Sequence, residues 1–476
     1  MTVDPEPSRP EPSRMQLSKT YDPKEVEARW YQRWVDAGYF KPDPDPSKPT
    51  FCIIMPPPNV TGELHLGHAL TAAVEDLLVR WHRMRGDATL WLPGRDHAGI
   101  AGQLVVEREL AAEGEGPTRH DLGREAFLER VWRWMDHYGA AIGVQHRRLG
   151  VSVDWGRERF TMDPGPSRAV RTAFVRLFEK GLIYKGARIT NWCPRCATAL
   201  SDLEVVHEEE PGVLTYVLYP LVPIDGETET RHIQIATTRP ETILADTGIA
   251  VHPEDNRYTD IVGRLALVPS VSRPIPIVAD DIVERGFGTG AVKVTPGHDP
   301  TDFEIGLRHN LPTILVIGLD GKMNESAGAR YAGVPVMQAR RAFVDELRSL
   351  GLLVKEDAHP HQVGHCVRCS TIVEPLVSEQ WYVRIQPLAE AALAAVRDGR
   401  IRIIPERFTK VYFNWMENIR DWCISRQLWW GHRIPVWTCA NGHVFAALDD
   451  PSTCVTCGSS ELTQDPDVLD TWFSSG

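Results

Sequence analysis

The order of apolar and polar residues near the start of the chain predicts a helix and then a strand–helix–strand unit. Asp22-Pro-Lys-Glu supplies a capping residue, a proline at the first helical position and an acid at the third, so a helix is expected over about 23–37. The apolar run FCIIM predicts a buried strand at 51–55, helical periodicity follows as far as Gly86, and ATLWLPG predicts a strand at 88–94. This alternation favours a parallel α/β sheet.

Between residues 210 and 355 the pattern changes to β-rich runs divided by glycine and proline, such as LTYVLYPLV, RHIQIATT, RLALVPSV and GAVKVTP. This region begins shortly after one pair of cysteines and ends shortly before another. We therefore predict a β-rich module inserted in an α/β domain, with the cysteines at its neck. Tryptophan-rich segments resume from residue 403 onward.

Composition is that of a soluble protein with several domains. A chain of 476 residues with 42% hydrophobic and 24% charged residues can form two or three cores. The net charge of −12 argues against a broadly basic nucleic-acid-binding protein, but it allows a local basic groove. The proline-rich, acidic start lacks the features of a secretory or transit signal, and we expect a disordered tail. No apolar run reaches the roughly 18 residues of a membrane span, so we expect a cytoplasmic protein.

Seven of the nine cysteines are grouped in the sequence. In a reducing compartment such pairs indicate metal binding more often than disulfides. The first set has the Cys-x2-Cys … Cys-x2-Cys form of a structural zinc site: Cys193, Cys196, Cys366 and Cys369. In the second set a histidine stands where a second cysteine is expected, and we predict a Cys3His site: Cys439, His443, Cys454 and Cys457. The alternatives are thiols kept without metal and, for His443, an ordinary loop residue.

The stretch PPPNVTGELHLGHAL, residues 56–70, joins the first predicted strand to the next helix. Backbone N–H groups at a helix N-terminus form an anion site, and His65 and His68 share the first turn. Gly67 leaves room for a flat ring against the backbone. The stretch suits a nucleotide whose α-phosphate is attacked. The alternatives are two histidines that only cap the helix, or a metal site made by histidines.

This stretch resembles the His-x-Gly-His nucleotide motif of class I aminoacyl-tRNA synthetases, and its Asn-Val-Thr-Gly resembles the valyl branch of that class. Five further segments resemble that branch in the same order: LPGRDHAGIAGQLVVE, ATTRPETILADTGIAVHPEDNRY, GTGAVKVTPGHDPTDFEIGLRHNLP, DWCISRQLWWGHRIPVW and DVLDTWFSSG. The resemblance covers residues from about 15 to 476. It implies a Rossmann-like parallel-sheet catalytic domain with an inserted β-rich editing domain and small zinc-binding modules.

The resemblance implies roles in the activation of valine. His65 and His68 would bind the ATP phosphates and stabilise the transition state, with Gly67 and Thr61 also in the ATP site. Asp96 would hold the valine ammonium, although a carboxylate after a strand can equally cap a helix. Pro56, Asn59 and Trp472 would shape the pocket for the isopropyl group. The tryptophan is the less specific of these, because tryptophan is more often part of a core.

The resemblance also implies that the inserted module hydrolyses threonyl-tRNA, since an apolar pocket cannot strongly reject the hydroxyl that distinguishes threonine from valine. The matching positions are Thr238, Arg239, Thr242, Phe287, Lys293, Thr295, Asp299 and Asp302. Asp299 is expected to bind the free ammonium, and Lys293 and Thr295 to recognise the threonine hydroxyl and orient a water. The alternative for both aspartates is loop capping. Arg426 and Gln427 are candidates for substrate contact, whereas the nearby tryptophans are expected to pack.

The resemblance implies ATP with Mg²⁺ as substrate, two structural Zn²⁺ ions, tRNA(Val) and valine as partners, no membrane, and a monomer. The second motif of the class, Lys-Met-Ser-Lys-Ser, is absent from the sequence, and Lys322-Met323 lies inside the predicted module. We therefore expect a portion of a longer valine-tRNA ligase that lacks full activity by itself. Two alternatives stay open: a hydrolase that only deacylates tRNA, and an inactive fragment that binds tRNA or a nucleotide.

The domain boundaries that follow begin with a tail at 1–20 and an N-terminal helix and linker at 21–45. The first part of the catalytic domain, with the first zinc knuckle, is expected at 46–205, and the inserted editing domain at 206–358. The second knuckle and the return to the catalytic domain follow at 359–435, the second zinc module at 436–460, and a last, truncated catalytic segment at 461–476.

Overall fold

The computed structural model describes residues 20–43, 45–114 and 117–475. The predicted tail therefore lies outside the described residues, apart from Thr20. The chain divides into two compact units, one formed by residues 1–96 and 135–160 and the other by residues 97–134 and 161–476. Within the described ranges, no helix combines the length and apolar character that crossing a bilayer requires.

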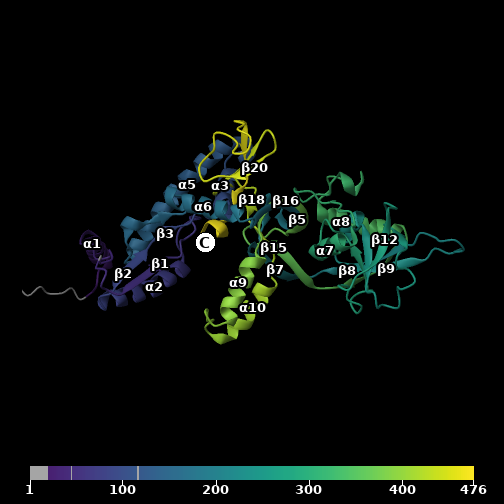
Figure 1. The fold of residues 1–476 in the computed structure, drawn as a ribbon, viewed down its shortest axis with the longest axis horizontal. Helices are drawn as coiled ribbons and strands as arrows, with labels where there is room; N and C mark the ends of the chain where they lie inside the picture. The colour runs from purple at the N-terminus through teal and green to yellow at the C-terminus, as the bar shows by residue number, and fades with distance from the viewer. Residues whose placement is uncertain (1–19, 44, 115–116, 476) are drawn as a thin grey trace, which may run out of the picture. The chain divides into compact units, whose positions relative to one another are not determined.

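The first unit contains the predicted strand–helix–strand (Figure 1). Strands β1 (Thr50–Ile54) and β2 (Ala88–Leu92) are joined by helix α2 (Leu66–Met84) and pair in parallel. A second, shorter parallel pair is formed by β3 (Gly94–Arg95) and β4 (Arg159–Phe160). The predicted parallel pairing is confirmed, and it requires a connection of this length between the two strands.

Helix α1 (Pro23–Asp36) begins as predicted, because the Asp22 carboxylate accepts the backbone N–H of Lys24. The hydroxyl of Tyr31 on this helix is buried, where it donates to the carbonyl of Val151 and accepts the indole N–H of Trp155. The unit has its own apolar core of Met55, Ala72, Val79, Trp91, Val151 and Val153.

The second unit is organised around one antiparallel sheet with the strand order β17–β16–β5–β6. Its two long strands, β5 (Ile183–Cys193) and β16 (Glu374–Val383), pair along their length, and β6 (Thr198–Leu200) and β17 (Trp422–Cys423) complete it. The helices that precede the sheet in sequence are α3 (Gly99–Ala111), α4 (Arg119–Leu122), α5 (Arg124–Leu149) and α6 (Pro164–Glu179). Residues 124–134 of α5 belong to this unit.

Two strands connect this sheet to residues 211–360, which we call the module. β7 (Val205–Glu210) and β15 (His361–Cys366) pair antiparallel from Val205↔Cys366 to Glu210↔His361, and we call this pair the neck. The predicted neck is thus a continuous β-ladder, and Cys366 at its base is one of the grouped cysteines.

The module holds two small sheets covered by helices that the sequence analysis did not predict (Figure 1). The first sheet is β14 (Leu353–Ala358), β8 (Val213–Pro220) and β9 (His232–Thr237). The second is β11 (Leu265–Leu267), β12 (Pro274–Ala279), β10 (Gly248–Val251) and β13 (Ala291–Val294). The helices are α7 (Pro300–His309) and α8 (Val336–Ser349), and Phe343 and Leu347 of α8 lie in the same core as Val217 and Ile235 of the first sheet.

After the central sheet the chain forms a helical hairpin, α9 (Gln386–Arg397) and α10 (Thr409–Glu417), which run side by side (Figure 1). The last elements are β18 (Ser425–Arg426), β19 (Val436–Cys439), β20 (Val444–Ala446), β21 (Leu462–Gln464), β22 (Val468–Leu469) and α11 (Thr471–Ser475). Residues 97–134 and 161–205 belong to a unit different from that of β1 and β2, and the domain boundaries expected from the sequence stay predictions.

Candidate functional site

The two histidines of HLGH form the N-terminal cap of α2. The His65 Nδ1 accepts the backbone N–H of Gly67 at 3.0 Å, and the His68 Nδ1 accepts the backbone N–H of His65 at 3.2 Å. Because each Nδ1 is an acceptor, the proton of each neutral ring is assigned to Nε2. The helix start therefore carries two imidazole Nε2–H donors besides its own backbone N–H groups, which suits an anion.

Gly67 is required by this arrangement. A Cβ at Gly67 would lie 2.8 Å from Cε1 and 3.0 Å from Nδ1 of His65. The sequence analysis left room for a flat ring against this backbone, and the ring that lies there is the imidazole of His65. Capping of the helix by the two histidines is therefore compatible with the predicted binding of a phosphate.

A third histidine from the same unit lies near this helix start. Burial, with smaller effects of the nearby His68 and Arg147, lowers the pKa of His146 to about 4. The pKa of His68 is itself lowered, first by burial and then by His65. Gln145, next to His146, accepts the backbone N–H of Leu64 at 2.8 Å and so fixes the loop before the motif. Burial and mutual repulsion thus favour neutral rings at neutral pH.

The residues predicted to bind the amino acid are only partly brought together. Asn59 and Asp96 lie side by side in a parallel bridge, with the Asp96 N–H donating to the carbonyl of Pro58 and the Val60 N–H to that of Asp96. Asp96 is buried, Asn59 and Thr61 are half-buried, and Pro56 is exposed. Trp472 belongs to the other unit, where it is half-exposed on α11. Its backbone N–H donates to the carboxylate of Asp470.

In the module, Lys293 of β13 and Thr295, directly after that strand, lie in a buried polar cluster. The Lys293 ammonium donates to the Thr295 hydroxyl at 2.5 Å, and that hydroxyl donates to Asp246 Oδ1, also at 2.5 Å. The Tyr219 hydroxyl donates to the other oxygen of Asp246 at 2.6 Å. Asp246 is fully buried, and burial raises its pKa. The sequence analysis missed this residue, because nothing in ILADTG marks it as the partner of a lysine 47 residues later.

The two predicted aspartates of HDPTD occupy different environments. Asp299 is exposed and caps α7, since its Oδ1 accepts the N–H groups of Thr301 and Asp302 at 2.7 and 3.0 Å. Asp302 is buried and accepts the N–H of Thr295 at 2.8 Å. Burial raises the pKa of Asp302 to about 7. The capping alternative thus describes Asp299 well, and its contact with an ammonium group stays a prediction.

Arg239 joins the turn after β9 to the segment before α7 and to the central sheet. It donates to the carbonyl of His298 at 3.3 Å and to the carboxylates of Glu241 and Glu374 at 3.3 and 2.5 Å. Thr242 is buried, with its hydroxyl donating to the carbonyl of Arg239. The structure thus brings the predicted TTRPET and HDPTD segments together and engages Arg239 in ion pairs.

The remaining predicted positions of the module are Thr238 and Phe287. Thr238 is half-buried. Phe287 exposes 52% of its surface, and its ring lies 5.9 Å from that of His359. The exposed ring of Phe287 is therefore accessible to a ligand, unlike the side chains of Lys293 and Thr295.

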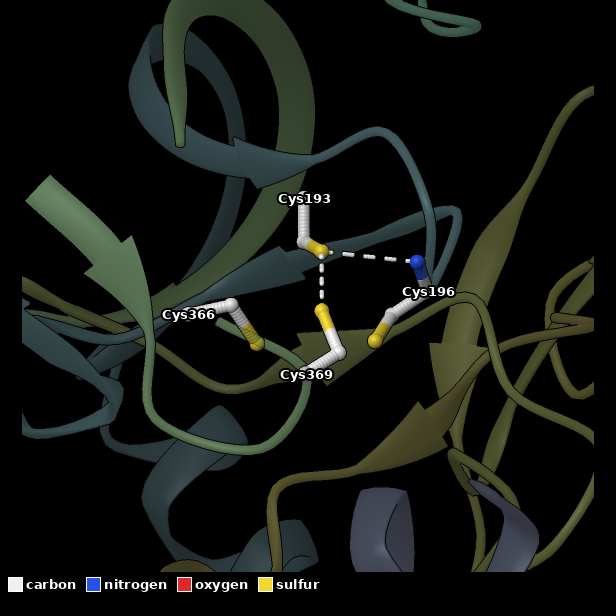
Figure 2. Close-up of side chains that lie close together, drawn as sticks. All are labelled: Cys193, Cys196, Cys366 and Cys369. Carbon is white, nitrogen blue, oxygen red and sulfur yellow. Dashed lines mark hydrogen bonds between the residues drawn. The ribbon is translucent and has the colours of Figure 1, made fainter. Parts of the chain in front are cut away.

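The four cysteines of the first set come together at the base of the neck (Figure 2). Their sulfur atoms all lie within 4.8 Å of one another, and the Cys193 and Cys369 sulfurs are 3.4 Å apart. Cys193 and Cys366 are the last residues of β5 and β15, and Cys196 and Cys369 lie in the turns that follow these strands. Four thiolates at such spacing fit the tetrahedral coordination of zinc.

The second set also assembles, with His443 in place. One ligand atom from each residue, Cys439, His443, Cys454 and Cys457, lies within 4.8 Å of the others. The His443 Nδ1 is 3.4 Å from the Cys439 sulfur, and the Asn441 side chain donates to the Cys457 sulfur at 3.3 Å. The geometry therefore suits the predicted Cys3His site, and metal binding there stays a prediction.

Arg426, a candidate for substrate contact, is instead part of the core. Its guanidinium is 1% exposed and pairs with Glu204 at 2.6 Å and Asp470 at 2.9 Å. Gln427 accepts the N–H of Ala199 and donates to Asp467. The expectation that Arg426 contacts substrate is not supported, because its side chain is almost completely buried and also donates to the carbonyls of Cys423 and Ser425. Trp430 packs in the core as expected.

Comparison with known proteins identifies relatives over nearly the whole chain. Residues 29–476 match the family model described as tRNA synthetases class I (I, L, M and V). The valine–tRNA ligase of Dehalococcoides mccartyi is 59% identical over 461 residues, which are 97% of this chain and 52% of that protein. The valine–tRNA ligase of Geobacter sulfurreducens is 57% identical over 97% of this chain and 51% of that protein. This chain spans about half the length of the curated relatives it matches.

Among solved structures, the ternary complex of Agrobacterium radiobacter K84 agnB2 LeuRS with tRNA and LeuAMS aligns with 96% of this chain and 59% of that chain. The sequence identity is 18% and the TM-score is 0.45, a likeness too distant for a comparison of residues.

Proposed function

The chain belongs to the class I tRNA synthetase family. On that premise we propose that it forms part of a valine–tRNA ligase, which activates valine with ATP and transfers it to tRNA(Val). The observation that carries this proposal is the 56–59% identity to valine–tRNA ligases over 96–97% of the chain. Because the chain spans about half of those relatives, the activity, the substrates and the tRNA partner are all proposals.

In the proposed activation step, a carboxylate oxygen of valine attacks the α-phosphorus of ATP, and pyrophosphate leaves. No covalent enzyme intermediate is needed, so positioning and charge stabilisation supply the rate. The α2 N-terminus and the Nε2–H groups of His65 and His68 are placed to donate to the phosphate oxygens as their charge grows. Gly67 and Thr61 complete the proposed ATP site, with Mg²⁺ bound to the phosphates.

Valine itself is proposed to lie beside the bridge between Asn59 and Asp96. A buried carboxylate next to a strand end can bind the valine ammonium. Pro56, in the same unit, is proposed to line the pocket for the isopropyl group.

The module is proposed to hydrolyse threonyl-tRNA(Val). Water would attack the ester carbonyl, and the tRNA 3′ hydroxyl would leave with a proton. Supporting this, the predicted TTRPET and HDPTD segments lie together around Arg239, and Asp299 and Phe287 are exposed beside them. The Lys293–Thr295–Asp246 cluster is buried, so we propose that it positions β13, while Asp299 and Thr238 contact the substrate.

Structural zinc is proposed at both clusters. At the first, Cys193, Cys196, Cys366 and Cys369 would hold the ion and fasten the two strands of the neck to the central sheet. At the second, Cys439, His443, Cys454 and Cys457 would hold it between β19 and β21. The ion would supply folding free energy and take no part in the reaction.

Calorimetric titration with non-hydrolysable aminoacyl-adenylate analogues tests the proposed specificity. We expect the valyl analogue to bind at least tenfold more tightly than the isoleucyl analogue, whose extra methylene is worth about 1–3 kcal/mol in an apolar pocket. His65→Ala should weaken binding, whereas His137→Ala, at an exposed position of α5, should not. Equal affinity for the two analogues in a folded chain would overturn the valine assignment.

A further inference from the structure

The hairpin of α9 and α10 presents a surface with few internal partners. Over the nine residues of α10, none is buried, although the helix carries Val411, Tyr412, Phe413 and Trp415. Phe408, Val411 and Trp415 are 47%, 62% and 52% exposed. Their spacing of three and four residues places them on one face of the helix. We call this apolar face, together with the nearby cations Arg402, Arg407 and Lys410, the hairpin surface.

The net charge of the segment that contains the hairpin is opposite in sign to the net charge of the whole chain. Residues 384–420 hold seven Lys and Arg and four Asp and Glu, a net charge of +3 in a chain of net −12. Two of the acids are used internally, since Glu417 pairs with Arg397 at 2.6 Å and Asp398 with Arg400 at 2.9 Å. Within residues 117–475 and the other described ranges, Arg402, Arg407 and Lys410 have no carboxylate partner, and all three are exposed.

The cations and the aromatic rings are interleaved. The Arg407 guanidinium lies over the ring of Phe408, 5.1 Å from its centroid. Lys410 lies on α10, and Arg407 lies in the single helical turn Glu406–Phe408 that leads into it. A row of exposed rings with unpaired cations along its edge is the arrangement that binds single-stranded nucleic acid, because phosphates pair with the cations and unpaired bases stack on the rings.

We propose that the hairpin surface binds single-stranded RNA, with phosphates at Arg402, Arg407 and Lys410 and bases stacked on Phe408 and Trp415. Its identification as an unpaired part of a tRNA rests on the proposed function. A second copy of this chain is a poorer occupant, because three unpaired cations would be desolvated against an apolar face. Duplex RNA is also poorer, since its bases cannot reach the rings.

Fluorescence anisotropy of a labelled single-stranded RNA of about 20 nucleotides and mixed sequence tests this proposal on the full chain. The variant Arg402→Glu/Arg407→Glu/Lys410→Glu should weaken binding at least tenfold. It should also lower the slope of log K against log salt by about 2, because each lost phosphate contact removes about 0.7. Trp415→Ala should weaken binding roughly fivefold or more.

Two matched variants separate a specific surface from bulk charge. Arg176→Glu/Lys180→Glu/Arg341→Glu makes the same charge change at exposed positions of α6 and α8 and should leave the slope within about 0.5 of the unchanged chain. Arg402→Lys/Arg407→Lys should keep the slope of the unchanged chain. An equal effect of both triple variants would overturn the proposal, as would equally tight binding of a duplex that Trp415→Ala does not affect.

The RNA measurement needs neither valine nor catalysis, so its failure differs from failure of the proposed function. If the chain prefers the valyl-adenylate analogue but binds RNA independently of the hairpin, the proposed function stands and the proposed role of the hairpin surface is wrong. Self-association that Trp415→Ala abolishes, without an effect on RNA binding, would assign the surface to a protein contact and overturn the proposal.

Discussion

At the scale of single residues, the HLGH stretch uses each imidazole at both of its nitrogens. The Nδ1 atoms of His65 and His68 accept backbone N–H groups at the start of α2, which leaves Nε2–H as the donor toward a ligand. The sequence analysis weighed capping against phosphate binding as alternatives. It could not combine them, because the assignment of roles to the two nitrogens depends on backbone geometry that the residue types do not encode.

Gly67→Ala should destabilise the start of α2, because the added Cβ would meet the His65 ring at 2.8 Å and displace it from its cap. Loss of a cap costs about 1 kcal/mol, and affinity for the valyl-adenylate analogue should fall with it. Urea unfolding and calorimetry measure the two effects. The matched variant is Gly286→Ala in an exposed turn of the module, where nothing lies within 4 Å of the added Cβ, and it should be neutral or slightly stabilising. If both variants behave alike, His65 does not depend on Gly67.

His298 should make the module less stable in mild acid. Its Nε2 accepts the N–H of Val316 inside the core, and burial together with Arg239 lowers its pKa to about 3, although Glu241 opposes this effect. A folded-state pKa below the unfolded value of about 6.5 contributes stability above pH 6.5, and this is lost as pH falls toward 3.

The difference in free energy of unfolding between the unchanged chain and His298→Gln should therefore shrink by about 2 kcal/mol between pH 7 and pH 5. Denaturant unfolding at the two pH values measures it. Other titrating groups, such as His146 and Asp302, are present in both chains and cancel in the difference. A difference that does not change with pH would mean that folding does not lower the pKa of His298.

At the scale of elements, strands and helices with strong local patterns were predicted well. The strand at 51–55, the helix after it and the strand at 88–94 correspond to β1, α2 and β2 because apolar period and capping residues agree there. The neck followed from the placement of cysteines at both ends of the β-rich region. Helices α7 and α8 were missed because the β-rich runs around them dominated the reading of that region.

Metal analysis should find about two zinc ions per chain, one at each cluster. Cys366→Ser and Cys457→Ser should each lower the count to about one, while Cys423→Ser, a buried thiol outside both clusters, should leave it unchanged. Removing zinc with a chelator should speed hydrogen exchange in β7 and β15 more than in β8 and β9, because the first cluster lies at the base of the neck. A count that Cys457→Ser does not change would show that the second cluster holds no metal.

At the scale of the whole molecule, the order of long matching segments predicted the family, and the family model confirms it over residues 29–476. Partners that meet only through the tertiary fold were not predictable. Asp246 joins Lys293 across 47 residues, and Arg426 is drawn into an ion triad with Glu204, 222 residues before it. Such pairs arise from the packing of strands distant in sequence, so a single sequence offers no local pattern for them.

The activity that we propose for the module is the removal of threonine from tRNA(Val). Its most direct test is the rate at which the 476-residue chain hydrolyses threonyl-tRNA(Val) and valyl-tRNA(Val). We predict that the unchanged chain hydrolyses the threonyl ester and spares the valyl ester, and that Asp299→Ala reverses this preference. Asp22→Ala, which removes a comparable helix cap from α1, should keep it. Equal hydrolysis of both esters by the unchanged chain and by Asp299→Ala would contradict the account.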